Sequence, residues 1–446
     1  MPKKTTRSQH TEIVSKSKPH FLIDIDILNE ALKSLYALRK SSKLNRWDDY
    51  EQEAENEDFG FKNAEALHAV LLPLGSRLKG IDDYSHKKEI QKDLDALLSR
   101  CLKKEKGKIK LDYSPGLLLS PETKDSLVDF AATTLRLYLL AKKVGCSEKN
   151  AEKVDELITE TTKALLHGAL QREVGTAWPG VLIPEEQSNH HRPDTFFTVS
   201  AMLALYDVAC SEASPLTKQI KDQCRDIIVK AAYWLEKRFN DSSVASDDEG
   251  GVSSIVYFTY ALTAFLTCWD LLDEERHKTC SKMAKAYLKL LRNEKISAPK
   301  LHHPIVVSDN RATLSYEDRS SLGSVLTVLS LMKHRMGNDP EFDQADFSEQ
   351  MANIYSQVLA DRDASAGLWS GARVTIYASY RAIEGVVQHA LYTRAVPSIL
   401  SEREIVDAVL EVLNSGKVRE AIVANLMKRA DELSAKEIEK VLEEKK

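Results

Sequence analysis

The feature that most constrains the fold is a repeated pair of helical segments. From Lys62 onward, a segment that is apolar almost all round alternates with a segment that is apolar on one face only. The apolar segments begin near Lys62, Pro121, Asp194, Gly251, Ser315 and Gly371. The amphipathic segments follow them at 86–104, 147–172, 215–239, 273–293, 341–362 and 401–413. Because a helix that is apolar all round is buried, the pattern predicts six inner and six outer helices.

Such an alternation predicts an all-α fold, a closed α/α toroid of about six inner and outer helix pairs. An open α-solenoid has the same alternation, but its repeats are usually about 34 to 47 residues long. The spacing here is close to sixty residues, which favours closure. The low numbers of helix breakers, 17 glycines and 13 prolines, agree with a helical fold.

Composition and charge divide the chain into four expected parts. Residues 1–20 are polar and form a disordered lead-in, and 21–58 hold an N-terminal helix and a very acidic connector. The toroid covers 59–414, and 415–446 form a charged C-terminal helical tail.

Link lengths show which end of the toroid carries the function. The links from inner to outer helices are short, whereas most links from outer to inner helices are long. The inner helices must then run parallel, with the long loops gathered where these helices begin. Long loops on a rigid scaffold are where binding and catalysis usually occur.

At the level of fold only, the alternation from about 62 to 413 resembles the α/α toroids of terpenoid cyclases, protein prenyltransferase β subunits and (α/α)6 glycosidases. This resemblance implies a pocket at the N-terminal ends of the inner helices. The catalytic motifs of these families do not carry over, because DxDD, DDxxD and a zinc-binding Asp/Cys/His set are absent from the sequence. The string 309–313 with Glu317 only loosely resembles a terpene synthase metal motif, since Asn310 stands where that motif has aspartate.

Two long loops contain the same types of residue. The loop before the third inner helix contains Trp178, His190, His191, Arg192 and Asp194, and the loop before the fifth contains His302, His303, Asp309, Arg311 and Glu317. Histidine and arginine beside a helix N-terminus could bind an anion or ligate a metal. The alternative is that Asp194 caps its helix within a solvated loop. We expect no metal site and no cofactor.

Two further loops complete the candidate ligand-binding residues. Asp247 and Asp248 precede the fourth inner helix, and Trp369 and Arg373 precede the sixth. Paired carboxylates could serve as general acid and base in glycoside hydrolysis, with Trp178 and Trp369 as sugar platforms. Helix capping is the simpler role for the two aspartates.

The inner helices themselves contain few polar groups that could take part in chemistry. Their charged residues are Asp129, Arg136, Asp207, Arg381 and Glu384, of which the last two have the spacing of an internal ion pair. In the fourth inner helix, tyrosines and threonines such as Tyr260 and Thr263 either line a mildly polar pocket or pack in the core.

The absence of common catalytic motifs from the sequence bears on the expected function. The sequence has no GxSxG, P-loop, GxGxxG or HExxH signature. This favours a non-catalytic toroid, a binding or scaffold subunit of a cytoplasmic assembly that presents its polar mouth to a protein partner or a small anionic ligand. The alternative is a toroid enzyme, of lyase, cyclase or glycosidase type, acting on a glycan or a phosphorylated small molecule at that mouth.

Charge and hydropathy bear on other partners and on localisation. The net charge of −5 does not favour nucleic acid, although the lysines of 103–110 form a local basic run. The uncharged stretch 250–269 approaches the length of a membrane span, but its hydroxyl groups favour a buried helix. Six cysteines without CxxC spacing and an N-terminus without an apolar signal segment predict reduced thiols and a cytoplasmic location, with no membrane contact.

Overall fold

The computed structural model describes residues 20–392 except 42–46, 48–59, 77, 79, 82–85, 115–125, 183–192, 242–254, 294–301, 308–309, 316–321, 338–343, 364 and 370–374. The chain divides into two units, Met1–Arg394 and Ala395–Lys446, and all described residues belong to the first.

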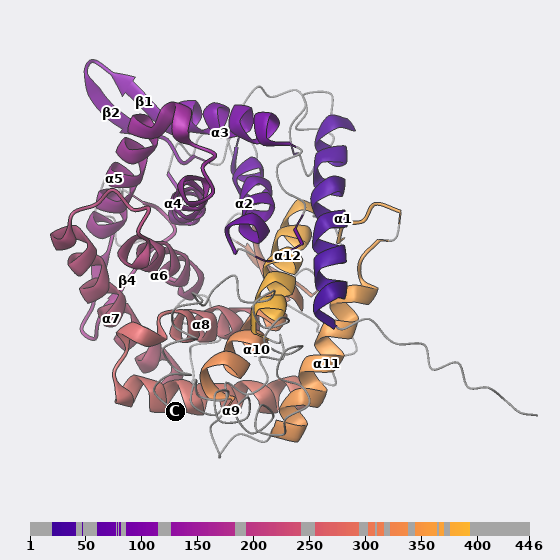
Figure 1. Ribbon diagram of the computed structural model, residues 1–446. Coiled ribbons are helices and arrows are strands. Elements are labelled where there is room, and N and C mark those ends of the chain that lie inside the picture. The colour runs from indigo at the N-terminus through magenta and orange to yellow at the C-terminus, as the bar shows by residue number, and fades with distance from the viewer. Residues whose placement is uncertain are drawn as a thin grey trace, which may run out of the picture. The chain divides into compact units, whose positions relative to one another are not determined.

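A closed ring of six helices forms the inner layer of this unit. These helices are α2 (Phe61–Gly75), α4 (Val128–Lys143), α6 (Thr195–Cys210), α8 (Ile255–Thr267), α10 (Leu322–Met336) and α12 (Thr375–Tyr392). Each packs against the next, and α12 packs against α2, which closes the ring (Figure 1). The predicted all-α closed toroid is confirmed.

The outer layer packs on this ring. It contains α1 (His20–Ser41), α3 (Lys87–Cys101), α5 (Ala151–His167), α7 (Lys218–Asn240), α9 (Glu274–Asn293) and α11 (Gln344–Ala360). Each of α3, α5, α7, α9 and α11 packs on the inner helix that precedes it in the chain. Short 3-10 helices, Glu148–Asn150 and Trp269–Leu271, precede α5 and α9.

Helix α1 belongs to this outer layer, although the sequence pattern placed it before the toroid and gave 401–413 as the sixth outer helix. It packs on α12 and α2, at the position where the ring closes. Its buried Asp24 accepts a hydrogen bond from the Tyr355 hydroxyl of α11 at 2.6 Å and lies 2.8 Å from Nδ1 of His389 on α12. At the other end of α1, Arg39 forms a bidentate ion pair with Asp93 of α3. Residues 401–413 and the tail 415–446 lie outside the described residues.

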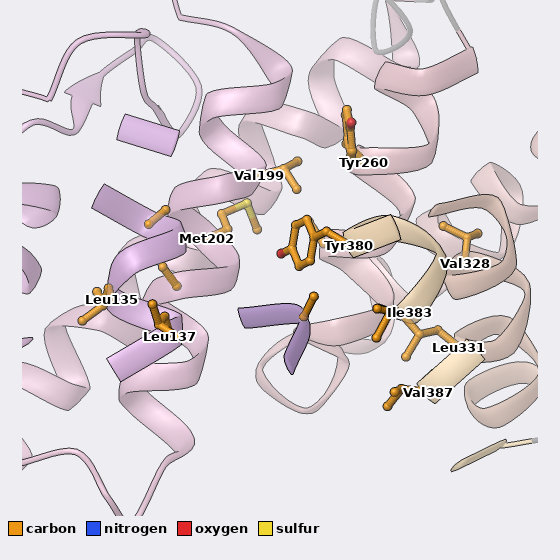
Figure 2. Packing of buried hydrophobic residues seen from close by; sticks show 14 of the residues in the cluster. Leu135, Leu137, Val199, Met202, Tyr260, Val328, Leu331, Tyr380, Ile383 and Val387 are labelled. Carbon is orange, nitrogen blue, oxygen red and sulfur yellow. The ribbon is translucent and has the colours of Figure 1, made fainter. Parts of the chain in front are cut away.

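The six inner helices run parallel, as the link lengths predict. Residues near their N-terminal ends contact one another, for example Asp129 of α4 with Ser200 of α6, and Tyr260 of α8 with Tyr377 of α12. Residues from their C-terminal ends line a single cavity at the opposite end: Gly75, Lys143, Cys210, Thr267, Arg335 and Tyr392. Leucine, valine and isoleucine side chains of α4, α6, α10 and α12 pack between the helices (Figure 2).

Three of the long links contain antiparallel hairpins in place of the expected loops. The hairpins are β1 (Leu102–Glu105) with β2 (Lys108–Leu111), β3 (Leu170–Gln171) with β4 (Thr176–Ala177), and β5 (His302–Val307) with β6 (Asn310–Ser315). In the first, the turn residues Lys106 and Gly107 have φ of 51° and 77°, the left-handed geometry of a two-residue hairpin turn.

The basic run 103–110 lies on this first hairpin, and three of its five lysines form ion pairs. Lys103 pairs with Asp112 at 3.0 Å, Lys104 with Glu156 at 3.1 Å and Lys110 with Glu105 at 3.6 Å. These pairs place negative charge beside three lysines of the hairpin, and the expectation about nucleic acid stays a prediction.

A glycine allows a close approach of two inner helices, α10 and α12. A Cβ atom on Gly323 of α10 would lie 2.2 Å from the carbonyl oxygen of Arg381 on α12. Because the obstacle is backbone, only glycine fits at this position.

No helix in the described part of the chain is long and apolar enough to cross a membrane, and the stretch 250–269 contributes α8 to the inner ring. The six cysteines are thiols, and five of them are buried.

Candidate functional site

The structure places only some of the predicted site residues. Trp178, Asp194 and Trp369 are described fully, whereas for His302, His303 and Arg311 only the strand positions on β5 and β6 are described. The remaining candidates lie outside the described residues: His190, His191, Arg192, Asp247, Asp248, Asp309, Glu317 and Arg373. Convergence of the two histidine loops therefore stays a prediction.

Neither described tryptophan is a sugar platform, because neither indole has an exposed face. Trp178 is completely buried and Trp369 is 3% exposed. The indole N–H of Trp178 donates to the Leu165 carbonyl of α5 at 2.8 Å, and that of Trp369 donates to the Val358 carbonyl of α11 at 2.6 Å. Each tryptophan is hydrogen-bonded to an outer helix and to the inner helix that follows it, an arrangement that we call a tryptophan wedge.

Asp194 takes the alternative role that its sequence position allowed. Its carboxylate accepts hydrogen bonds from the backbone N–H groups of Phe196 and Phe197 at 2.6 and 3.3 Å. It is the N-cap of α6, and these bonds satisfy two donors that the helix leaves open.

The described polar groups that do converge lie inside the ring, near the N-terminal ends of the inner helices. There, residues of α4, α6, α8, α10 and α12 line a cavity of about 30 Å³, which we call the upper cavity. Its polar wall comprises Asp129, Ser200, Tyr260, Tyr380, Arg381 and Glu384. Tyr380 extends from α12 into the interior, toward the side of α6 that carries Val199 (Figure 2).

Asp129 is the residue of this cavity best suited to proton transfer. Burial and then the negative charge of Glu65 raise the pKa of its carboxyl to about 6, against the lowering effects of Arg381 and of the Ser200 hydrogen bond. Ser200 Oγ lies 3.1 Å from Asp129 Oδ1. A carboxyl with a pKa near neutrality can both donate and accept a proton under physiological conditions.

Arg381 supplies the fixed positive charge beside Asp129. Its guanidinium lies 5.5, 5.3 and 4.9 Å from the ring centres of Tyr260, Tyr377 and Tyr380. The hydroxyl groups of Tyr260 and Tyr377 are 2.6 Å apart. The cavity therefore combines a cation, aromatic rings and hydroxyl groups with two carboxyl groups, those of Asp129 and Glu384.

A network of ion pairs forms the floor of the upper cavity. Arg136 Nε lies 2.8 Å from Asp207 Oδ2, and Arg136 Nη1 lies 3.9 Å from Glu384 Oε1. Arg381 Nη1 lies 3.1 Å from Glu384 Oε2, so the expected internal ion pair is present. Burial opposes the charge on Arg136, but Asp207 and Glu384 outweigh it and raise the pKa of the guanidinium.

Below this floor lies a larger cavity of about 690 Å³, the lower cavity, at the C-terminal ends of the inner helices. Arg136 and Glu384 line both cavities, so their ion pair lies where the two meet. His68 of α2 lines the lower cavity and is buried. Burial and then the charges of Arg136 and Arg381 lower the pKa of its imidazole well below the usual value, which keeps it neutral.

Among the described residues, no group of three or more His, Cys, Asp or Glu side chains is arranged to hold a metal ion. The sequence identified Asp129, Arg136, Asp207, Arg381 and Glu384 as the charged residues of the inner helices. It did not identify Glu65 and His68, whose only signal was a polar residue on a helix apolar nearly all round.

Comparisons with known proteins extend the resemblance at the level of fold. No protein-family model matches the chain, and a search of curated proteins finds no relative by sequence. Solved structures do match. A D-mannose isomerase aligns with a TM-score of 0.56 and 12% identity over 84% of this chain and 100% of its own.

Two further structures have the same fold. The cellobiose 2-epimerase of Spirochaeta thermophila aligns with a TM-score of 0.55 and 12% identity over 84% of this chain and 98% of its own. The GH76A alpha-1,6-mannanase of Salegentibacter sp. aligns with a TM-score of 0.52 and 12% identity over 83% of this chain and 99% of its own. At this identity the likeness shows the fold, an α/α toroid of the glycosidase type.

These comparisons contradict the prediction of a non-catalytic scaffold. The toroids that the chain resembles over most of its length are named as enzymes: an isomerase, an epimerase and mannanases. They favour the enzyme alternative. The scaffold prediction rested on missing motifs, and a toroid site assembled from distant inner-helix residues needs no short sequence motif.

Proposed function

We propose that this chain is an enzyme that acts on a carbohydrate at the N-terminal ends of the inner helices, with Asp129 of the upper cavity as the general acid. One observation carries the proposal: a carboxyl with a pKa near 6 faces a polar cavity inside a closed toroid. A carboxylic acid whose pKa is raised toward neutrality is the proton donor that glycosidic bond cleavage requires.

Glu65 makes glycoside cleavage the favoured reaction. Its charge is one of the causes of the raised pKa of Asp129, which places a second carboxylate near the first. Glu65 pairs with Lys62 at 2.9 Å. Glycoside hydrolysis uses two carboxyl groups in different protonation states, one as acid and the other as base or nucleophile.

The polar groups around the upper cavity suit a neutral sugar. Tyr260 and Tyr380 contribute phenol hydroxyl groups, and Ser200 and Ser324 contribute alcohol hydroxyl groups. Arg381 is already paired with Glu384, so its positive charge does not require a negatively charged ligand. The named neighbours act on mannose, mannan and cellobiose, which supports a neutral sugar as the substrate class.

The test is a substrate screen with the full chain. Alpha-1,6-mannotriose, cellobiose and D-mannose are incubated with the protein, and products are followed by proton NMR. We expect cleavage of an oligosaccharide, lost in Asp129→Asn and retained in Asp222→Asn, which changes an exposed aspartate on α7. Interconversion of sugars without cleavage would replace hydrolysis by isomerisation at the same site.

Turnover that survives Asp129→Asn would overturn the assignment of the acid. Absence of any reaction with neutral sugars, together with turnover of a phosphorylated sugar, would overturn the proposed substrate class.

A further inference from the structure

The lower cavity has the size and composition of a small-molecule site of its own. Its volume of about 690 Å³ lies within the range of roughly 300 to 1,000 Å³ that ligand pockets occupy. All six inner helices contribute to it from their C-terminal ends, the end opposite to the upper cavity.

Three residues that line the lower cavity have a buried polar atom without a partner among the described residues: His68, Gln388 and Arg335, whose Nε is the third such atom. Nδ1 of His68 and Oε1 of Gln388 are both buried and make no hydrogen bond among the described residues. Both side chains line the cavity, and His68 is 2% exposed. A buried polar atom without a partner is costly, and such atoms require an explanation in a folded protein. A ligand that offers both donors and acceptors would satisfy the His68 and Gln388 atoms.

The charges of the lining indicate a neutral ligand. The lining contains Arg136, Lys143 and Arg335 as cations and Asp207, Glu212 and Glu384 as anions, so the signs balance. Arg136 is paired with Asp207, and Arg335 forms a bidentate pair with Asp270 at 3.0 and 2.8 Å. A charged ligand would have to compete with these pairs. The partial negative charge at six helix C-termini disfavours an anion further.

The remaining walls are apolar and aromatic. Leucines of α2, α4, α6, α8 and α10 line the cavity together with Tyr206 and Tyr392. The Tyr392 ring is held by stacking on His334, with ring centres 4.2 Å apart. Apolar faces combined with scattered hydrogen-bonding atoms match the two sides of a sugar ring, C–H groups and hydroxyl groups.

We propose that the lower cavity is a second binding site, separate from the reaction site, that takes a neutral mono- or disaccharide held by His68 and Gln388. This site stands on its own cavity and does not require that Asp129 perform catalysis. The ion pair between Arg136 and Glu384 lies between the two sites.

The experiment is a binding titration of the full chain with D-mannose and cellobiose, by calorimetry and by the nitrogen NMR signals of the histidine rings. We expect saturable binding that shifts the Nδ1 signal of His68. Gln388→Leu should weaken binding up to about tenfold, or 1.4 kcal/mol, the upper part of what one neutral hydrogen bond contributes. The matched control Gln357→Leu, on the outer helix α11, should leave affinity unchanged.

Asp129→Asn separates this proposal from the proposed function. Binding at the lower cavity should persist in that variant even when turnover is lost. Binding that disappears in Asp129→Asn and is unaffected by Gln388→Leu would place the sugar only at the Asp129 end of the ring and overturn the second site. Tighter binding of mannose 6-phosphate than of mannose would overturn the neutral ligand class.

Discussion

The indole N–H of Trp178 donates a hydrogen bond to the carbonyl oxygen of Leu165 at 2.8 Å, near the C-terminal end of α5. The backbone N–H of the same residue donates to Thr198 Oγ1 of α6 at 3.0 Å. One residue thus joins an outer helix to the next inner helix. The same arrangement occurs at Trp47, with Leu35 and Asn63, and at Trp369, with Val358 and Ser379.

This arrangement predicts that Trp178 contributes to stability and not to ligand affinity. Trp178→Phe keeps an aromatic ring but leaves the Leu165 carbonyl without its donor, which should lower the free energy of unfolding by about 1 to 3 kcal/mol. Trp269→Phe, at a partly exposed ring stacked on His277, should cost less. Urea unfolding measures both. A changed sugar affinity with unchanged stability would contradict the wedge role.

The buried pair of Arg39 and Asp93 predicts a pH-dependent defect. Burial raises the pKa of the Asp93 carboxyl, and Arg39 opposes that rise. Arg39→Ala removes the opposing charge, so the carboxylate becomes costlier to bury and stability should fall as the pH rises from about 5 to about 8. The loss at the higher pH should be about 3 to 5 kcal/mol.

Two controls accompany this variant. The double variant Arg39→Met with Asp93→Leu should recover most of the stability, because no unpaired charge remains. Lys163→Ala breaks an exposed pair with Glu160 and should cost under about 1 kcal/mol at either pH. An Arg39→Ala defect that is equal at both pH values would show that the lost packing of the arginine, not the buried carboxylate, is responsible.

The contact of α10 with α12 predicts that Gly323 tolerates no side chain. In Gly323→Ala the new Cβ would meet the Arg381 carbonyl at 2.2 Å, so the two helices must separate, at a cost of about 1 to 3 kcal/mol or more. The displacement would also move Arg381 in the upper cavity. Gly75→Ala is the matched control, since its new Cβ meets the movable end of the Leu140 side chain. Equal melting temperatures for the two variants would refute the close backbone contact.

The inner ring could be predicted because burial imposes a local pattern. A helix such as α8 is surrounded by protein, so apolar residues occur on all its sides and are visible in the sequence. The role of α1 could not be predicted in this way. Its amphipathic pattern shows that one face is buried, but not that α12, more than 300 residues later, covers that face. The link from Asp24 to His389 spans 365 residues.

The candidate site also depends on contacts between residues far apart in the sequence, which a local pattern does not show. The sequence shows that Asp129 and Arg381 are charged residues of inner helices. Their chemical role depends on which side chains they contact across the ring. Asp129 contacts Ser200 at a separation of 71 residues, and Tyr260 contacts Tyr377 at 117. The structural role of the three tryptophans could not be predicted for another reason. The residues that bind their backbone N–H groups lie 16, 20 and 10 positions later, so no fixed spacing marks the arrangement.

Asp129 should be a residue whose removal stabilises the protein while it abolishes turnover. Its folded pKa of about 6 lies above the ordinary aspartate value of 3.8, so the folded state binds a proton more tightly than the unfolded state does. The carboxyl therefore destabilises the fold progressively as the pH rises from about 4 to above 6, by up to about 3 kcal/mol for a shift of two pKa units. Asp129→Asn carries no charge, so it should gain stability over the wild type near pH 8 and show little gain near pH 4.

The same substitution should have the opposite effect on activity, which it abolishes. A general acid must be protonated, so the rate of the wild-type enzyme should fall as the pH rises through about 6, and Asp129→Asn should be inactive at every pH. Thermal unfolding across the same pH range, run beside Asp222→Asn, separates the two effects. If Asp129→Asn is less stable than the wild type near pH 8, the carboxylate stabilises the fold through the Ser200 hydrogen bond and the charge of Arg381, and its assignment as a proton donor with a raised pKa fails.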